Sequence, residues 1–143
     1  RHTMFDWLRK PKITDDAPMR RYTARAAKQL DGAQAEALAC AHLQKQGLKL
    51  IDANLACTRG EIDLLMLDGH TLVFIEVRWR KNAQFGGAAA SVTAAKLKKL
   101  LTACEVFFQN QPKWRDQPCR VDVVALEGAL SDPQIDWLKN VTG

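Results

Sequence analysis

Two carboxylates and one arginine, held in two short apolar segments, are the side chains of this sequence best suited to chemistry. Asp63 lies in the segment 61–67, and Glu76, Val77 and Arg78 lie in the segment 72–80. An ionised Glu76 buried among apolar neighbours would cost several kcal/mol unless a cation or hydrogen-bond donors compensated its charge. Two carboxylates that converge beside basic groups form a hard-oxygen site, which suits Mg²⁺ or Mn²⁺.

A divalent ion at such a site would neutralise a phosphate group and lower the pKa of a bound water. Arg78 is the natural cation to stabilise the negative charge that develops during phosphodiester cleavage. We therefore take Asp63, Glu76 and Arg78 as candidate catalytic residues. The same spacing also fits an ion-pair network that merely satisfies buried charge, and spacing does not separate the two interpretations.

Basic residues follow the Glu76 segment closely. Six Lys or Arg residues and no acid lie between Val77 and Cys104, which predicts an electropositive border suited to a polyanion such as a nucleic-acid backbone. The candidate nucleic-acid-binding residues are Arg80, Lys81, Lys96, Lys98 and Lys99.

The net charge of +5 arises at the N-terminus, because residues 1–29 hold eight Lys or Arg residues and three Asp, while the rest of the chain is balanced. Two parts are expected: a basic N-terminal arm, 1–29, that is either mobile or a partly ordered lead-in, and one domain, 30–143. Residues 1–3 precede Met4 and are interpreted as a cloning remnant. The arm could add phosphate affinity or only improve solubility.

Hydrophobic patterns predict the elements that must position the candidate residues. A helix is expected from a capping box at Asp31 and Gln34 to a stop at Gly47. Strands are expected at 48–56, 61–67 and 72–80, with an Asp68-Gly69 hairpin turn between the last two, so that Asp63 and Glu76 become obliquely adjacent. A helix over 90–110, a strand over 120–126 and a short alternating piece around 135–137 complete the chain. The sequence thus predicts an α/β fold with αβββαβ order and a mixed central sheet flanked by helices.

Other chemistries find little support. The four cysteines are scattered and form no Cys-x-x-Cys pair, so neither a disulfide framework nor a zinc ribbon is expected. No segment has the length and apolarity of a membrane-spanning helix, and no signal peptide is visible, which favours the cytoplasm and no membrane partner. Asp122 in the last predicted strand is expected to join a buried network with Arg120.

Several segments together resemble the YraN family, bacterial proteins with a restriction-endonuclease-like core similar to archaeal Holliday junction resolvases. These segments are GAQAEALA (32–39), RGEIDLL (59–65), LVFIEVRWR (72–80), FGG (85–87) with SVT (91–93) and Lys96, and CRVDVV (119–124). The resemblance covers about residues 24–139 and implies a restriction-endonuclease-like core of the PD-(D/E)xK nuclease superfamily.

The resemblance also implies roles for individual residues. Asp63 and Glu76 would be metal-binding carboxylates, with the Val77 carbonyl as a further metal ligand. Glu36 matches a helical acid of resolvase-like members and joins the candidate catalytic residues, and Lys96 matches a basic position on the following helix. The superfamily has a lysine where this chain has Arg78, and arginine cannot act as a general base because it is always charged.

The function expected from these observations is that of a metal-dependent endonuclease or resolvase-like phosphodiester hydrolase that uses Mg²⁺ or Mn²⁺. A DNA- or RNA-binding module without significant cleavage is the alternative, and an adaptor role is a third. DNA, branched DNA included, is the expected partner, with RNA as an alternative. A homodimer is implied by the resemblance, because resolvases make two symmetric cuts.

Overall fold

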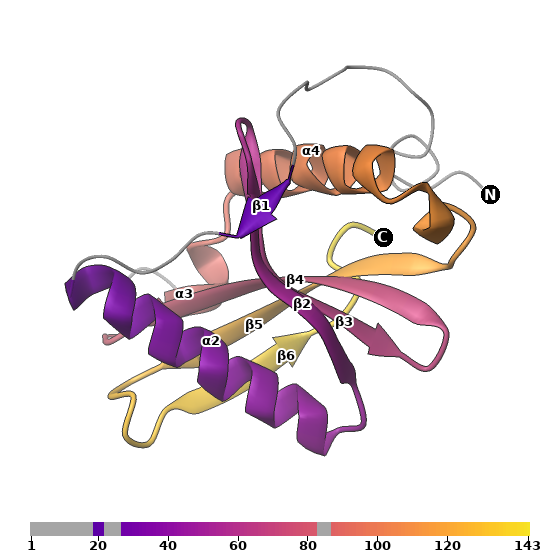
Figure 1. Ribbon diagram of the computed structural model, residues 1–143. Coiled ribbons are helices and arrows are strands. Elements are labelled where there is room, and N and C mark those ends of the chain that lie inside the picture. Colours follow the sequence, from indigo (N-terminus) through magenta and orange to yellow (C-terminus); the bar gives the residue numbers. More distant parts are fainter. Residues whose placement is uncertain (1–18, 22–26, 83–86) are drawn as a thin grey trace.

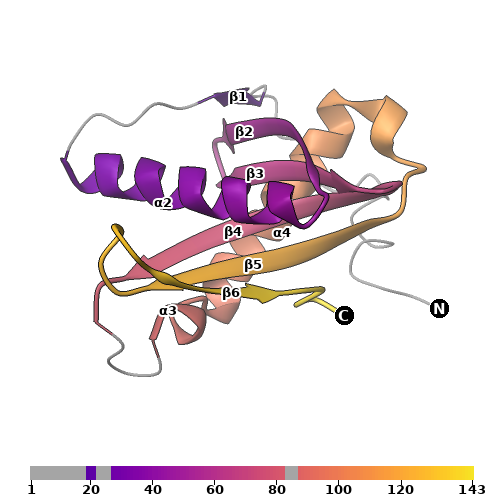
Figure 2. The same cartoon turned by 90° about the horizontal axis from the view of Figure 1, so that it is seen from below.

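The computed structural model describes residues 19–21, 27–82 and 87–143, and it describes side chains for all of these except residues 21 and 27–29. In this part of the chain a six-stranded sheet has the order β1-β2-β3-β4-β5-β6 (Figures 1 and 2). The strands are β1 (Arg20–Arg21), β2 (Lys49–Cys57), β3 (Gly60–Asp68), β4 (Thr71–Arg80), β5 (Cys119–Glu127) and β6 (Gln134–Leu138). The helices are α2 (Ala27–Lys45), α3 (Gly87–Ala90), α4 (Ala94–Asn110) and the short 3₁₀ helix η2 (Pro112–Trp114).

The sheet is mixed because β4 and β5 pair in parallel, whereas the other neighbouring strands pair antiparallel. A parallel pair needs a crossover connection, and α3 and α4 provide it. Figure 1 shows α4 on one side of the sheet and α2 on the other. The predicted αβββαβ order and the mixed central sheet flanked by helices are therefore confirmed.

β4 lies between the two helical layers, which explains why its sequence is apolar on both faces. Leu72 and Phe74 pack in the core on the α4 side, and Val73 and Ile75 pack in the core on the α2 side. The ring of Phe74 makes edge-to-face contacts with Phe107 and Phe108, at centroid distances of 5.6 Å each. By the same alternation, Glu76 and Arg78 belong to the face that α4 covers.

Three predicted boundaries are wrong. α2 begins at Ala27, so Asp31 is an exposed residue within the helix and not its N-cap, because Ala27 to Leu30 are themselves good helix formers. The helix predicted over 90–110 is α4, which begins only at Ala94, because Thr93 is its N-cap: Thr93 is extended, with φ −81° and ψ 164°, and its side chain accepts a hydrogen bond from Lys96 N at 3.3 Å. The hairpin turn is Gly69-His70, one residue later than predicted, because Asp68 pairs with Thr71.

In both β2 and β3, the alternation of side chains between the two faces of the sheet is broken at the same position along the ladder. In a regular strand, residues two apart point to the same side of the sheet. Ala53 nevertheless packs on the α2 side and Leu55 on the α4 side, and in the partner strand Leu64 packs on the α2 side and Ile62 on the α4 side. The residues between them, Asn54 and Asp63, face each other in the ladder, and the strands bend there (Figure 1).

A buried charge network ties the C-terminal residues to the sheet, as expected for Asp122. This side chain is fully buried and accepts hydrogen bonds from Arg120 Nε at 3.0 Å, Trp137 Nε1 at 2.9 Å and the Asn140 N–H at 2.9 Å. Arg120 also forms an ion pair with Asp68 at 2.8 Å. The network stabilises the fold and is separate from the Glu76 face.

Much of the predicted basic arm lies outside the described residues, namely 1–18 and 22–26, as do residues 83–86, which include Phe85 and Gly86 of the FGG segment. β1 and the first residues of α2 fall within the arm. None of the helices in the described ranges is long and apolar enough to cross a membrane.

Candidate functional site

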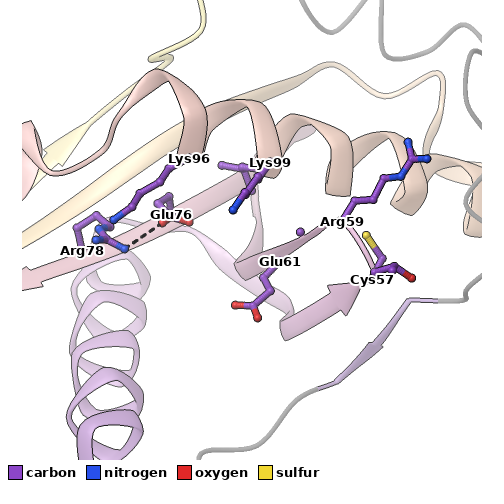
Figure 3. A pocket seen from close by; sticks show the side chains of 10 residues that line it. Cys57, Arg59, Glu61, Glu76, Arg78, Lys96 and Lys99 are labelled. Carbon is purple, nitrogen blue, oxygen red and sulfur yellow. Dashed lines mark ion pairs between the residues drawn. The ribbon is translucent and has the colours of Figure 1, made fainter.

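A pocket of about 620 Å³ lies where the β2–β3 hairpin end, β4 and the first half of α4 meet (Figure 3). Its lining residues are Cys57, Thr58, Arg59, Gly60, Glu61, Glu76, Arg78, Lys96, Lys99 and Leu100. Two acids and four cations therefore share one concave surface.

Glu76 is the acid at the pocket wall with the most perturbed environment. Its side chain is 16 % exposed, and its Oε2 lies 3.6 Å from Arg78 Nη1. Burial and the negative charge of Asp63 raise the pKa of Glu76 from 4.5 to about 8, although the positive charges of Arg78 and Lys96 oppose the shift. With a pKa of about 8, Glu76 holds a proton at neutral pH even though Arg78 and Lys96 lie nearby.

Asp63 connects β3 to β4 at the point where their ladder ends. The last registered pair is Leu64 with Ile75, so Asp63 lies just past the end of the ladder, at the level of Glu76. Asp63 is 8 % exposed, and its Oδ2 accepts a hydrogen bond from the Val77 N–H at 2.9 Å. A side-chain hydrogen bond also joins Asp63 and Glu76 and contributes to the raised pKa of Glu76. The predicted convergence of the two carboxylates is therefore present.

Arg78 is fixed by residues on two elements. In addition to its ion pair with Glu76, it donates a hydrogen bond from Nε to Ser91 Oγ at 3.2 Å. Ser91 follows α3 directly and donates its hydroxyl hydrogen to the Ala88 carbonyl, while the Ala88 N–H is bound by Glu127 at 3.2 Å. The guanidinium of Arg78 is 19 % exposed, so it is oriented toward the pocket without being sealed from it.

The other pocket cations come from α4 and from the hairpin end. Lys96 and Lys99 project from α4, and Arg59 lies across the pocket from them (Figure 3). Partial burial and the positive charges of Arg78 and Arg80 lower the pKa of Lys96, and Glu76 opposes this shift. Like charges thus crowd this end of the pocket, where an anion would relieve their repulsion.

The remaining predicted residues lie outside the pocket lining. Arg80, Lys81 and Lys98 are exposed, and Arg80 donates a hydrogen bond to its neighbour's carbonyl, Trp79 O, at 2.8 Å. Glu36 is half-buried on α2, the helix that covers the opposite face of the sheet. The structure therefore brings together Asp63, Glu76, Arg78, Lys96 and Lys99, but not the whole predicted set.

A metal ion at this site would need main-chain or solvent ligands in addition to side chains. Among the described residues no group of three or more His, Cys, Asp or Glu side chains could hold an ion. The Val77 N–H points toward Asp63. Because the N–H and C=O groups of one strand residue point to the same side of the strand, the Val77 carbonyl also points toward β3. Two hydrogen-bonded carboxyl groups and one such carbonyl form an all-oxygen set that fits Mg²⁺ or Mn²⁺.

Sequence reasoning did not identify the hairpin end as a wall of the site. A Cβ on Gly60 would overlap the Lys99 carbonyl oxygen, so the hairpin end lies directly against the α4 backbone. Glu61 also lines the pocket, and burial and the charge of Asp63 raise its pKa. The glycine beside a basic residue was the available indication, since glycine permits close approach of two backbones.

Comparison with known proteins identifies the family of this chain. The profile of the "Uncharacterised protein family UPF0102" matches residues 35–126. A UPF0102 protein of Pseudomonas fluorescens is 48 % identical over 113 residues, which covers 78 % of this chain and 92 % of the relative. A UPF0102 protein of Pseudomonas aeruginosa is 46 % identical over 120 residues, covering 82 % and 96 %. These relatives are YraN-like, as the sequence motifs indicated, and the chain belongs to the UPF0102 family.

Proposed function

We propose that this protein is a metal-dependent phosphodiester hydrolase that acts on nucleic acid, with a restriction-endonuclease-like site. The observation that supports this most strongly is the hydrogen-bonded pair of Asp63 and Glu76 carboxyl groups at a pocket with four cations. Two carboxyl groups that share a proton can exchange it for a divalent cation, because the cation removes their mutual repulsion. The positive charges of the surrounding side chains would attract a negatively charged phosphate backbone.

Each residue has a defined part in this proposal. Asp63, Glu76 and the Val77 carbonyl would hold Mg²⁺ or Mn²⁺, and the bound ion would supply a water of lowered pKa and neutralise phosphate charge. Arg78, held by Ser91, stabilises negative charge on the phosphate. It cannot remove the proton from the attacking water, since arginine keeps its charge.

Lys96, Lys99 and Arg59 bind the phosphates on either side of the scissile bond. Lys96 and Lys99 belong to α4 and Arg59 belongs to the hairpin end, so a nucleic-acid backbone in the pocket meets positive charge from both elements. DNA is the proposed substrate, with branched DNA included and RNA as the alternative. Arg80, Lys81 and Lys98 would extend the contact beyond the pocket.

A cleavage assay tests this function. The protein is incubated with branched, flapped, single-stranded and duplex DNA, and with RNA, in the presence of Mg²⁺ or Mn²⁺. Asp63→Asn and Glu76→Gln should reduce cleavage by about 100-fold or more, because each removes a charged ligand while keeping the side-chain shape. The matched control is Asp31→Asn, which neutralises an exposed acid on α2. Cleavage that is independent of metal or of Asp63 would contradict the proposal.

A nucleic-acid-binding module without cleavage is the second candidate, and the observation that favours it is Arg78 in place of a lysine. This function predicts salt-dependent binding that survives Asp63→Asn. Replacing Lys96 and Lys99 by alanine should flatten the slope of log affinity against log salt by about 2, since two phosphate contacts are lost. Alanine at Lys45 and Lys49, two exposed lysines near the far end of β2, provides a control with the same change of charge. Binding that is insensitive to salt would contradict both candidates.

A further inference from the structure

Asn54 has a backbone conformation that is unusual within a strand. Its φ is +56°, in the left-handed region that non-glycine residues rarely adopt. It lies in β2 at the level where both β2 and β3 change face, between the ladder pairs Ala53–Leu64 and Leu55–Ile62. The ladder pairs on both sides of Asn54 keep a regular register, and the register shift of β2 lies earlier, between Leu50 and Asp52. The left-handed backbone of Asn54 therefore redirects the strand without an extra residue.

The bend at Asn54 separates two parts of the β2–β3 hairpin with different neighbours. On one side of the bend, residues Leu64 to Asp68 of β3 pair with β4. Beyond the bend, the hairpin end approaches α4, and Gly60 reaches the Lys99 backbone. The space that opens between this hairpin end and β4 is the pocket.

The same bend changes what Asp63 contacts. With the ladder ended at Leu64, the Val77 N–H is bound by the Asp63 carboxylate instead of by a β3 carbonyl. A β3 that continued straight would direct its backbone at Val77 and turn the Asp63 side chain onto a face of the sheet. The carboxylate could then no longer lie in the plane between the two strands.

We propose that Asn54 is a positioning residue, whose left-handed backbone turns Asp63 out of the β3–β4 ladder and so places its carboxylate beside Glu76. The link to catalysis rests on the function proposed above, whereas the link to Asp63 rests on geometry alone. The role is assigned to the backbone: the side-chain oxygen, Asn54 Oδ1, is buried and accepts no hydrogen bond among the described residues.

Two substitutions at Asn54 separate the backbone from the side chain. Asn54→Gly keeps the left-handed conformation at no steric cost, whereas Asn54→Ala penalises it. The matched control is Asn140→Ala, because Asn140 has nearly the same φ of 55° but binds Asp122, away from the pocket. The readouts are hydrogen exchange of the Val77 amide, followed by NMR, and metal-dependent DNA cleavage.

In wild type and Asn54→Gly we expect a protected Val77 amide. In Asn54→Ala its exchange should be about tenfold faster, since an alanine disfavours the left-handed backbone by about that factor. Cleavage should fall in parallel in Asn54→Ala and stay near wild type in Asn54→Gly. Asn140→Ala should change global stability but neither readout at the site.

Loss of Val77 protection in Asn54→Gly would overturn the proposal, as would unchanged protection in a folded Asn54→Ala. If Asn54→Ala does not fold, the glycine variant alone decides. The amide measurement needs neither metal nor nucleic acid. If the Val77 amide exchanges as expected in these variants but wild type cleaves no DNA, the proposed function is contradicted. The positioning role of Asn54 would still be supported.

Discussion

Glu76 is a carboxylic acid that the fold keeps protonated, and this couples folding stability to pH. Its pKa is about 8 in the folded protein and close to 4.5 in an unfolded chain, because burial and Asp63 disfavour the charged form. Between these two values the folded state binds more protons than the unfolded state. The free energy of unfolding should therefore be highest below about pH 4.5, as far as Glu76 is concerned, and should fall as pH rises toward about 8.

Glu76→Gln should remove this contribution, since glutamine is neutral at every pH. Urea unfolding in a metal-free buffer at about pH 5 and about pH 8.5 should show a loss of at least about 1 kcal/mol for wild type and a smaller loss for the variant. Asp116→Asn, which neutralises an exposed acid outside the pocket, should keep the wild-type difference. Equal pH dependence in wild type and Glu76→Gln would show that Glu76 is already ionised near neutral pH.

At the scale of elements, the pocket exists because the β2–β3 hairpin end rests on α4. Gly60 makes this contact possible, as a side chain there would overlap the Lys99 carbonyl oxygen, which belongs to the helix backbone and cannot rotate away. The hairpin end and α4 therefore act as one unit. The width of the pocket depends on their separation.

Gly60→Ala should destabilise the protein by about 1–3 kcal/mol, because the hairpin end must move away from α4. The comparison variant is Gly32→Ala in the middle of α2, where the added methyl group meets no atom within 4 Å. That change should stabilise the helix by about 0.5–1 kcal/mol. Thermal or urea unfolding measures both, and destabilisation of similar size in the two variants would contradict the close contact at Gly60.

Sequence patterns predicted the helices and strands better than the turns and bends that connect or interrupt them. The apolar run of β4 and the alternation around it gave the central strand, because burial on both faces leaves a direct mark on composition. The face change at Asn54 leaves no such mark, since Asn fits turns, strands and caps alike. That Asp63 lies at the level of Glu76 depends on the turn at Gly69-His70, one residue later than the Asp68-Gly69 turn that the sequence predicts.

For the candidate site, the sequence predicted the carboxylates and Arg78 but not their partners. Ser91 binds Arg78 across thirteen residues of chain, and Glu127 holds α3 from the end of β5. Neither contact follows from local periodicity, because both depend on how the α3–α4 crossover is laid over the sheet. Lys98 shows the reverse case: it shares a basic run with Lys96 and Lys99, but it lies outside the pocket lining.

At the scale of the whole molecule, the two aspartates that are buried among the described residues have different roles. Asp63 reaches from β3 to β4 at the pocket, whereas Asp122 joins β5, β6 and the C-terminal residues, and its partner Arg120 extends the network to Asp68. The first is expected to determine activity. The second is expected to determine how firmly the sheet and the C-terminal residues are held together.

Asp122→Asn should cost about 3 kcal/mol of stability, because Arg120 loses one of its two charged partners, and the Trp137 and Asn140 N–H groups lose a charged acceptor. Denaturant unfolding gives this loss, and cleavage per folded molecule should remain at the wild-type level below the unfolding transition. Asp63→Asn should do the opposite, with a large loss of cleavage and a smaller loss of stability. Parallel losses of both properties in both variants would contradict this division.

The pairing of β1 has a consequence for how this protein can be shortened. Arg20 and Arg21 pair with Ala56 and Leu55, on the part of β2 that lies beyond Asn54. The backbone groups along this margin of the sheet are thus covered by residues that precede α2. A version trimmed to start at α2 would uncover them, and an uncovered strand margin is a template for strand-to-strand association between molecules. Trimming would thus favour self-association at the margin next to the pocket wall, so a shortened form could precipitate even though its core and its carboxylates were unchanged.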